Sequence, residues 1–384
     1  MNILTLNKIS KVGTNEFSGG YTVSDSCENP DAIMVRSASM HDMVMPESLL
    51  AIARAGAGVN NIPINTCAEK GIVVFNTPGA NANAVKELAI ASLILASRDI
   101  VGGIEWVKTI SGDDIAKQVE KGKSNFAGHE ISGKTLGVVG LGAIGVNVAN
   151  AAYSLGMKVL GYDPYISLKS AWNLSSHIGK AATLDELYEN CDIICIHAPL
   201  TDETNRFVNE ESIAKMKDGM VIINLSRADL VNDADIAKAL ENGKIAKYIT
   251  DFPNPDTVKM KNCICIPHLG ASTEESEDNC AYMAAHELID YLENGNITNS
   301  VNFPNVEMPK ASAVRICVFH KNIPAILSKV SSVISSQNIN IANMINKSKG
   351  DFAYTMIDCD DNITDETITL LKNIDGIIRI RVIK

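Results

Sequence analysis

Gly140, Gly142 and Gly145 follow an apolar strand and open an amphipathic helix, in G-x-G-x-x-G spacing. The first glycine permits a tight turn, the second lets a pyrophosphate approach the backbone, and the third lets helix and strand pack closely. The helix N-terminus adds unpaired N–H groups and a partial positive charge for phosphates. Asp163 ends the next strand, 18 residues past Gly145, where a carboxylate accepts hydrogen bonds from ribose hydroxyls and repels a 2′-phosphate. The sequence therefore predicts a dinucleotide site that prefers NAD to NADP.

Three further apolar strands end in a residue that could do chemistry, namely Arg227 in NLSRADLV, Asp251 in YITDF and His268 in IPHLG. Ligands of doubly wound sheets lie at the carboxyl ends of the strands, so these side chains could meet near the cofactor. A single arginine after a strand is usually a solvated surface residue. Three such strand ends beside a dinucleotide motif instead predict an acid/base site, with the imidazole as proton carrier.

The composition is that of an ordinary globular chain of two or three domains, with 46% hydrophobic and 21% charged residues among 384. The net charge of −11 argues against a nucleic acid or an anionic membrane as the main partner. The N-terminal MNILTLNKIS lacks the layout of a signal peptide, and no apolar run reaches the roughly 18 residues of a membrane span. The nine scattered cysteines lack metal-finger spacing, so we expect reduced thiols, no metal site and a cytoplasmic location.

The elements that must position these residues fall into three regions. In residues 2–81, short apolar strands (NILTLN, DAIMVRS, GIVVFNT) alternate with two stretches predicted as helices, PESLLAIARAG and PINTCAEKG. From Gly133 the strands become nearly unbroken runs of Val and Ile between helical segments, which indicates a parallel doubly wound sheet covered on both faces. After a long helix (ASTEESEDNCAYMAAHELIDYLENG) and a linker (NITNSVNFPNVEMPKAS), the order βαββαβ predicts a ferredoxin-like α+β module as a separate domain.

Four stretches, GLGAIG with VLGYDP, HAPLT, NLSRADLV and IPHLGAST, resemble the signature set of the D-2-hydroxyacid dehydrogenase family. The match covers roughly residues 1–303. VRSAS, RAGAGVNNI and NTPGANANAVKEL resemble the branch of that family whose substrate is 3-phosphoglycerate. The tail resembles an ACT domain, an amino-acid-sensing module.

The resemblance implies a Rossmann-type doubly wound parallel sheet inserted in a smaller, flavodoxin-like α/β substrate domain, followed by a ferredoxin-like ACT domain. The discontinuous substrate-binding domain would comprise residues 1–85 and 275–303, and the NAD-binding domain residues 86–274. Residues 304–311 would form a linker to a regulatory domain of residues 312–384. The resemblance also implies a homodimer or homotetramer.

The resemblance assigns roles at the active site. Arg227 would grip the α-carboxylate and keto oxygen of the substrate, and His268 would remove the hydroxyl proton while hydride moves to NAD. Arg36 and Arg54 match the phosphate-facing arginines of the family. Substrate contacts are also implied for Ala57, Gly58, Val59 and Asn81, and Lys86, where relatives often have a small residue, is hypothesised to hold the phosphorylated anion. The further cofactor contacts are Ala143, Ile144, His197, Pro199, Thr204, Ser226, Asp251 and Gly270.

The turn after Asp251 departs from the family pattern. The family usually reads Asp-Val-Phe-x-x-Glu-Pro here, with the glutamate paired with the histidine, whereas this chain reads DFPNPD. Asp251 keeps its place beside the nicotinamide amide, and Asp256 is the candidate partner of His268, one methylene shorter than glutamate. Because a lone imidazole still titrates in a useful range, we expect activity with an altered pH profile.

In the tail, His320, Asn322 and Asn340 align with ACT positions that contact L-serine in feedback-inhibited relatives. Ala325 stands where the family has a glycine after the proline, and its methyl group would crowd the ligand loop if φ is positive there. A serine-binding domain and a purely oligomerising domain both stay open as interpretations.

From the resemblance we expect NAD-dependent oxidation of 3-phospho-D-glycerate to 3-phosphohydroxypyruvate, which opens the phosphorylated route to L-serine. One alternative is another D-2-hydroxyacid dehydrogenase, such as a hydroxypyruvate or glyoxylate reductase. The other is a non-catalytic protein that senses NAD and an amino acid. Arg36, Arg54 and the tail favour the phosphorylated substrate, while Arg227 and His268 favour an enzyme.

Overall fold

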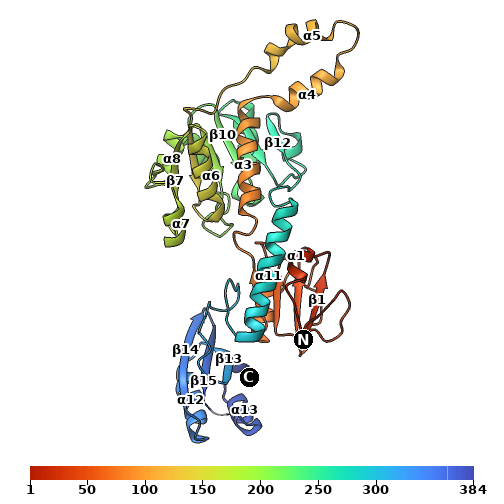
Figure 1. The fold of residues 1–384 in the computed structure, drawn as a ribbon. Coiled ribbons are helices and arrows are strands. Elements are labelled where there is room, and N and C mark those ends of the chain that lie inside the picture. The colour runs from red at the N-terminus through yellow and green to blue at the C-terminus, as the bar shows by residue number, and fades with distance from the viewer. Residues whose placement is uncertain (361) are drawn as a thin grey trace. The chain divides into compact units, whose positions relative to one another are not determined.

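A computed structural model describes residues 1–360 and 362–384 (Figure 1). The chain divides into two compact units. One comprises Met1–Asn81 together with Glu274–Lys384, and the other comprises Ala82–Thr273. Across the described ranges, no helix is long and apolar enough to cross a membrane.

The unit of residues 82–273 is built on a seven-stranded sheet in the order β12-β11-β10-β9-β6-β7-β8, with every pair parallel. The prediction of a parallel doubly wound sheet is confirmed. Runs of Val and Ile suit these strands because both faces are covered. The strands are β6 (Thr135–Val139), β7 (Lys158–Tyr162), β8 (Gly179–Lys180), β9 (Ile193–Ile196), β10 (Met220–Asn224), β11 (Ile245–Thr250) and β12 (Cys263–Cys265).

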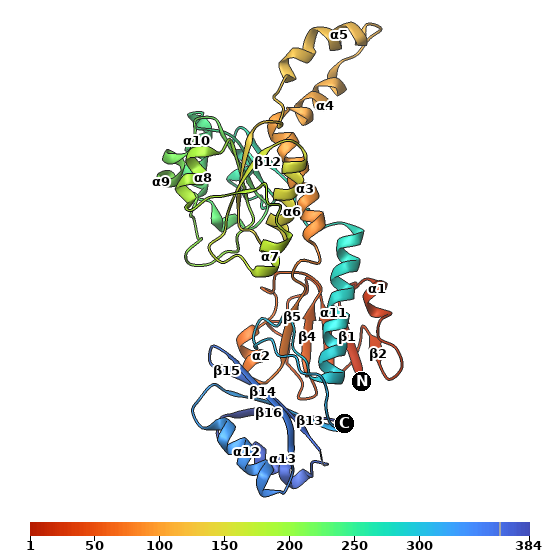
Figure 2. The same cartoon turned by 60° about the vertical axis from the view of Figure 1, so that its left-hand side comes forward.

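Two apolar clusters cover the two faces of this sheet. One contains residues of α3 (Ala82–Ser97) and α6 (Ala143–Ser154), and the other contains residues of α8 (Leu184–Asn190), α9 (Glu210–Lys215) and α10 (Asp233–Glu241). Figure 2 shows these two groups of helices on opposite sides of the sheet. The remaining helical segments are α4 (Ile100–Thr109), α5 (Ile115–Gly122), η1 (Lys123–Phe126), α7 (Leu168–Asn173), η2 (Ala228–Leu230) and η3 (Thr257–Lys259).

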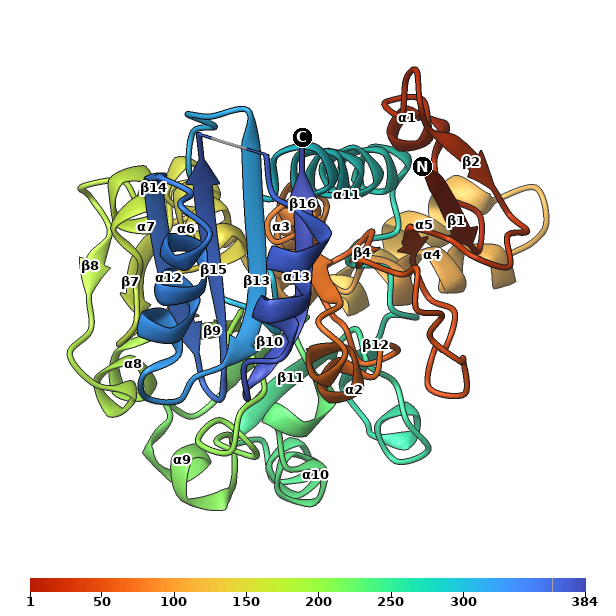
Figure 3. The same ribbon diagram turned by 90° about the horizontal axis from the view of Figure 1, so that it is seen from below.

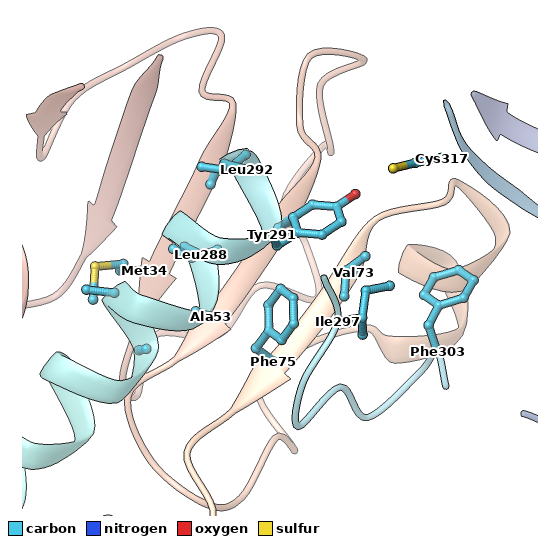
Figure 4. Close-up of a cluster of buried hydrophobic side chains, with 14 of the residues drawn as sticks. Met34, Ala53, Val73, Phe75, Leu288, Tyr291, Leu292, Ile297, Phe303 and Cys317 are labelled. Carbon is cyan, nitrogen blue, oxygen red and sulfur yellow. The ribbon is translucent and has the colours of Figure 1, made fainter. Parts of the chain in front are cut away.

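The other unit contains a five-stranded parallel sheet in the order β2-β1-β3-β4-β5. The long helix α11 (Glu274–Asn294) packs on it, and Phe75 of β5 contacts Tyr291 of α11 with ring centroids 5.8 Å apart (Figure 4). The other elements of this part are β1 (Asn2–Leu6), α1 (Lys11–Thr14), β2 (Thr22–Ser24), β3 (Ala32–Val35), β4 (Ala51–Arg54), α2 (Ile64–Glu69) and β5 (Val73–Asn76).

The prediction of a helix over PESLLAIARAG is wrong. Its centre, Ala51–Arg54, is strand β4, which pairs with β3 on one side and β5 on the other. A short apolar run suits a buried strand or a buried helix equally well by pattern, and length decides only for longer segments. Because this segment is a strand, its last residue, Arg54, lies at the carboxyl end of the sheet. A helix over the same residues would not have placed Arg54 there.

The C-terminal segment forms the predicted βαββαβ unit, with an antiparallel sheet in the order β14-β15-β13-β16. Helices α12 and α13 lie on one face of the sheet over a shared apolar cluster (Figure 3). On the other face, Phe319 contacts Tyr291 and Phe303, so this module belongs to the same compact unit as the five-stranded sheet. Its elements are β13 (Val314–Lys321), α12 (Ile326–Ser336), β14 (Ile341–Lys349), β15 (Phe352–Cys359), α13 (Asp365–Lys372) and β16 (Ile377–Ile383).

Candidate active site

The glycine turn between β6 and α6 has the backbone geometry that its motif predicts. Gly140 has φ +89°, and a Cβ there would lie 2.7 Å from the His197 carbonyl oxygen. A Cβ on Gly145 would lie 1.9 Å from the Gly140 carbonyl oxygen, which is the close helix–strand contact. A Cβ on Gly142 would meet nothing within 4 Å. Of the three glycines of the motif, only Gly142 has open space beside its backbone. A pyrophosphate would fill this space.

Asp163 holds the glycine turn from the end of β7. Its two carboxylate oxygens accept the N–H groups of Leu141 and Tyr165, each at 2.8 Å. Helix α6 has no side-chain cap at Gly142, so its first N–H groups stay available to an anion. A pocket of 580 Å³ adjoins this turn. It is lined by Val139, Gly140, Tyr162, Asp163, Pro164, Tyr165, Leu184, Ala198, Pro199, Thr201, Asp202, Glu203, Thr204 and Phe207.

His197 follows β9 beside the same turn. Its Nε2 lies 3.1 Å from Cys195 Sγ, and its Nδ1 is buried without a hydrogen-bond partner in the part of the chain described. Burial lowers the pKa of His197 to about 4, so the ring is neutral at physiological pH. An unpartnered polar atom of this kind fits a site built to receive a polar ligand. Together with the open space at Gly142, it shows that the residues present suit a dinucleotide.

Arg227 follows β10 and is held by its own backbone. The Asn224 side chain donates to the Arg227 carbonyl oxygen at 2.7 Å, and the Arg227 guanidinium donates to the Ser226 carbonyl oxygen at 2.6 Å. Ser226 Oγ in turn donates to the Ile196 carbonyl oxygen at 2.8 Å, which ties this turn to β9. The end of β10 therefore fixes the Arg227 guanidinium, and the guanidinium N–H groups that do not bond Ser226 stay available to a carboxylate.

Asp251 follows β11 and is almost completely buried, with 1% of its surface exposed. Its two oxygens accept the N–H groups of Leu269 and Gly270, each at 2.7 Å. Burial raises the pKa of Asp251, while the two N–H groups and the charge of His268 oppose that rise. Asp251 thus clamps the loop that carries His268.

His268 has a left-handed backbone, with φ +53°, and an exposed side chain. Its ring packs against Phe252 with centroids 4.9 Å apart. No ion pair or hydrogen bond joins the ring to a carboxylate within the described ranges. Asp256, the predicted partner, is exposed, and its N–H donates to Asn254 Oδ1 at 2.9 Å in a tight turn. The structure thus does not bring Asp256 to His268, and their pairing stays a prediction.

The predicted anion-binding residues in the unit with the five-stranded sheet lie at the ends of β3 and β4. Arg36 forms an ion pair with Glu277 of α11 at 2.6 Å, and Arg54 Nε donates to the Arg36 carbonyl oxygen at 3.0 Å. In the following loop, the N–H groups of Ala57, Gly58 and Val59 donate to no acceptor among the described residues. Two guanidinium groups and a run of N–H donors make this strand end suitable for an anion.

Two predicted substrate residues have other surroundings. Asn81 has a buried Oδ1 for which the described residues offer no donor. Lys86, on α3, forms an ion pair with Glu87 at 3.6 Å, and its side chain is 24% exposed. Neither contact tests the proposed role toward substrate.

The predicted serine-binding residues of the C-terminal module are engaged within the module. His320 is buried, and its Nε2 lies 2.9 Å from Thr355 Oγ1 and 3.2 Å from Asn346 Oδ1. Asn322 donates to the Gly350 carbonyl oxygen at 3.1 Å, and Asn340 donates to Asp360 at 2.6 Å. Ala325 has φ +66° at the N-cap of α12, so the condition under which its methyl group would crowd the loop is met.

Sequence reasoning missed the acidic partner of Arg36 and the asparagine that shapes the turn before His268. Glu277 is one of three acidic residues in the first turn of α11, and nothing in its spacing singles it out. Asn254 accepts the N–H groups of Asp256 and Thr257, each at 2.9 Å, and its own amide donates to Asp233 at 2.7 Å. Asn254 stands between two prolines, a pattern typical of turns, and this pattern could have indicated that Asn254 shapes the turn.

The doubly wound sheet, the open glycine turn and the strand-end arginine and histidine together define a dinucleotide-dependent dehydrogenase. Residues 90–270 match the NAD-binding domain of the D-isomer specific 2-hydroxyacid dehydrogenases. The chain is 31% identical over 350 residues to D-3-phosphoglycerate dehydrogenase of Haemophilus influenzae, covering 87% of this chain and 81% of that one. The chain belongs to the D-isomer specific 2-hydroxyacid dehydrogenase family.

Further relatives differ in length and in similarity. D-3-phosphoglycerate dehydrogenase of Archaeoglobus fulgidus is 34% identical over 287 residues, which are 72% of this chain but only 52% of that relative. The structure of NAD+-bound 3-phosphoglycerate dehydrogenase from Entamoeba histolytica superposes with a TM-score of 0.59 at 27% identity, covering 79% of this chain and 98% of that one. The expected cofactor of this family, NAD, is confirmed.

Proposed function

We propose that the chain catalyses NAD-dependent oxidation of 3-phospho-D-glycerate to 3-phosphohydroxypyruvate, the first step of phosphorylated L-serine biosynthesis. The observation that carries the proposal is the 31% identity to D-3-phosphoglycerate dehydrogenase of Haemophilus influenzae over most of both chains. The glycine turn, Arg227 and His268, at strand ends of one sheet, support it.

In this proposal NAD, when bound, supplies the hydride acceptor. Arg227 binds the substrate α-carboxylate and the oxygen at C2, which orients the C2 hydrogen and stabilises negative charge developing on that oxygen. His268 accepts the proton of the C2 hydroxyl through a ring nitrogen, so the alcohol becomes a ketone as hydride leaves. In the reverse direction the imidazolium returns the proton. Asp251 holds the His268 loop, and Asp256 stays the candidate partner of the imidazole.

Cofactor contacts are proposed for the residues around the glycine turn. Gly142, Ala143 and Ile144 would present N–H groups to the pyrophosphate, and Asp163 would accept ribose hydroxyls. Cofactor contacts are also proposed for His197, Pro199, Thr204 and Ser226, of which Pro199 and Thr204 line the pocket beside the turn. The pocket of 580 Å³ that Asp163 lines supports these roles.

Anion contacts are proposed for the end of the five-stranded sheet. Arg36 and Arg54 would bind the phosphate, and the N–H groups of Ala57, Gly58 and Val59 would bind the carboxylate. The absence of protein acceptors for these N–H groups among the described residues supports the second role. Asn81 and Lys86 would complete the binding of the polyanion.

The C-terminal module is proposed to be an ACT domain. Its βαββαβ order and its place after residue 303 support this. Serine binding through His320, Asn322 and Asn340 is a finer proposal, because these side chains already have partners within the module. Calorimetry with L-serine tests it. Heat on titration and inhibition at millimolar serine support a serine site, and their absence leaves a structural role.

The chain is also proposed to be a homodimer or homotetramer in the cytoplasm. Apolar side chains on α4 are strongly exposed, with Val101 at 50% and Ile104 at 52%, and this supports burial against a second copy. Val101→Glu with Ile104→Glu should shift sedimentation toward a smaller species. Nine free thiols support a reducing compartment.

The decisive experiment compares substrates. Purified protein with NAD should form NADH from 3-phosphoglycerate when the product is removed by coupling, and kcat/KM with glycerate should be lower by at least about tenfold, because two arginines lose their anion. Arg227→Ala and His268→Ala should each reduce kcat/KM by roughly a hundredfold or more. Equal kcat/KM for the two acids would favour another D-2-hydroxyacid dehydrogenase, and no NADH formation would favour a sensing protein.

A further inference from the structure

The segment after α11, predicted as a linker, forms an outer edge of the five-stranded sheet. Ser300 makes an antiparallel bridge with Phe75, and the Val301 N–H donates to the Val74 carbonyl oxygen at 2.9 Å. Asn302 accepts the Val74 N–H at 2.9 Å and donates to the Ile72 carbonyl oxygen at 2.8 Å. The segment therefore runs antiparallel to β5, from Asn299 beside Asn76 at the carboxyl end of the strand to Asn302 beside its start.

At the carboxyl end of β5, a buried carboxyl group holds Asn299. The Asn299 amide donates to Glu287 Oε1 of α11 at 2.7 Å, and Glu287 is only 5% exposed. The second oxygen of Glu287 is buried and has no partner among the described residues. Asn299 has φ +56°, a conformation that asparagine tolerates better than most residues. In this conformation its carbonyl oxygen accepts the N–H of Asn76, the last residue of β5, at 3.3 Å.

Asn76 in turn fixes the loop that follows β4. Its amide donates to the Ala57 carbonyl oxygen at 2.6 Å, and the neighbouring Thr77 N–H donates to the Gly56 carbonyl oxygen at 3.2 Å. In a trans peptide the C=O and the following N–H point in opposite directions. Holding the Ala57 carbonyl on Asn76 therefore aims the Gly58 N–H away from β5, and holding the Gly56 carbonyl does the same for the Ala57 N–H.

We propose that Asn76 is a positioning residue for the substrate carboxylate, held in place by Asn299 and the buried carboxyl group of Glu287. Asn76 does not touch substrate, because its amide is engaged with the Ala57 carbonyl oxygen. Through the Ala57 carbonyl it sets the direction of the Gly58 N–H, one of the three N–H groups proposed to bind the acid. The inference rests on the proposed function, since the carboxylate belongs to the proposed substrate.

The contacts form one path from α11 to the loop. Glu287 accepts from the Asn299 side chain, the Asn299 backbone accepts from Asn76, and the Asn76 side chain donates to Ala57. Each of these hydrogen bonds restrains the residue that makes the next one, so loss of the Glu287 carboxyl group should free Asn299, and loss of the Asn76 amide should free the Ala57 carbonyl. Loss of the path should loosen the loop without changing the cofactor unit, which is built from other residues.

The kinetic test uses Asn76→Leu, which keeps a similar volume but cannot donate. The expected result is a rise of about tenfold or more in KM for 3-phosphoglycerate, because misaligned N–H groups lose hydrogen bonds to a charged acid. The KM for NAD should change less than twofold. Glu287→Gln keeps an acceptor for Asn299 and should retain the wild-type KM, whereas Glu287→Leu should raise it. Asn302→Ala is the matched control, because Asn302 bonds Ile72 and Val74 at the start of β5 and not the loop.

A second measurement does not depend on activity. Hydrogen exchange of the peptide spanning residues 55–62 should become at least about tenfold faster in Asn76→Leu and stay near wild type in Asn302→Ala. An inactive wild-type chain would overturn the proposed function, and faster exchange in Asn76→Leu would still support the positioning path. An active wild type with unchanged KM and unchanged exchange in Asn76→Leu would overturn the path alone.

Discussion

The carboxylate of Asp251 accepts the N–H of Gly270 at 2.7 Å, and this contact joins the end of β11 to the loop that carries His268. A Cβ on Gly270 would lie 3.0 Å from the same carboxylate oxygen, so the loop passes close to the buried acid. The left-handed backbone of His268 is thus held from its C-terminal side by a charged acceptor. The imidazole ring packs on Phe252 and makes no bond to a carboxylate among the described residues.

Asp251→Asn tests this clamp. The amide retains one acceptor and turns an N–H donor toward a backbone N–H, so the loop loses a hydrogen bond to a charged group worth about 1.5–3 kcal/mol. We expect kcat to fall roughly tenfold to a hundredfold, with faster hydrogen exchange over residues 266–272. Asp233→Asn is the control, because Asp233 bonds Asn254 rather than the histidine loop. Wild-type kcat in Asp251→Asn would contradict the clamp.

Asp256→Asn tests whether a carboxylate is needed beside the imidazole. Asp256 is exposed, and no bond between it and His268 is present in the described structure. If Asp256 pairs with His268 when substrate is bound, the acid limb of the pH–rate profile should be displaced in Asp256→Asn. A profile that coincides with that of the wild type would exclude Asp256 as the partner.

Gly142→Ala separates cofactor binding from folding. The added methyl group would meet no protein atom within 4 Å, so the free energy of unfolding should change by less than about 1 kcal/mol. The same methyl group would occupy the space above the turn, and the KM for NAD should rise by about tenfold or more. Gly140→Ala is the contrasting variant, because its Cβ would collide with the His197 backbone and should lower the urea midpoint. An unchanged KM for NAD in Gly142→Ala would place the pyrophosphate elsewhere.

Glu287→Gln tests the buried carboxyl group through pH. Burial raises the pKa of Glu287 from 4.5 to about 8. Below pH 4.5 the Glu287 carboxyl is protonated in both the folded and the unfolded chain, and between pH 4.5 and 8 it keeps its proton only in the folded chain. The free energy of unfolding therefore falls as pH rises through this window and is constant above it. The wild type should lose on the order of 3 kcal/mol relative to Glu287→Gln between about pH 5 and pH 8.

Urea midpoints at the two pH values measure this difference. Glu275→Gln, at an exposed position on the same helix, should follow the wild type at both. If Glu287→Gln and the wild type lose stability in parallel, Glu287 is ionised in the folded chain.

Ala325→Gly tests the left-handed start of α12. A methyl-bearing residue at φ +66° costs about 1 kcal/mol that glycine avoids. The variant should unfold at a higher urea concentration. If the methyl group also blocks the ligand loop, heat should appear on titration with L-serine. Asn338→Gly, at φ +55°, is the control and should gain less because asparagine tolerates this conformation. A lower midpoint for Ala325→Gly would contradict the strain.

Much of the fold could be predicted because its signals are local. The strands of the NAD-binding unit other than β8 show nearly unbroken apolar runs, and the hairpin of β14 and β15 and the long helix α11 show their own periods of apolar residues. Strand β8 has only two residues and was not predicted. The glycine spacing identified the dinucleotide turn because its three tasks concern neighbouring atoms of the backbone. Strand β4 was missed because three apolar residues followed by an arginine carry too little pattern to separate strand from helix.

By itself the sequence determined the parallel sheet, the glycine turn and the strand ends that carry Arg227 and His268. These follow from residue order, since a parallel strand must finish at one edge of its sheet. Only the tertiary structure decided which groups restrain them. Asn302 bonds Val74 across 228 positions, Arg36 pairs with a helix far along the chain, and Asp256 stays apart from a histidine that lies close in sequence. Such contacts depend on where the packed elements bring side chains, and no local spacing encodes that.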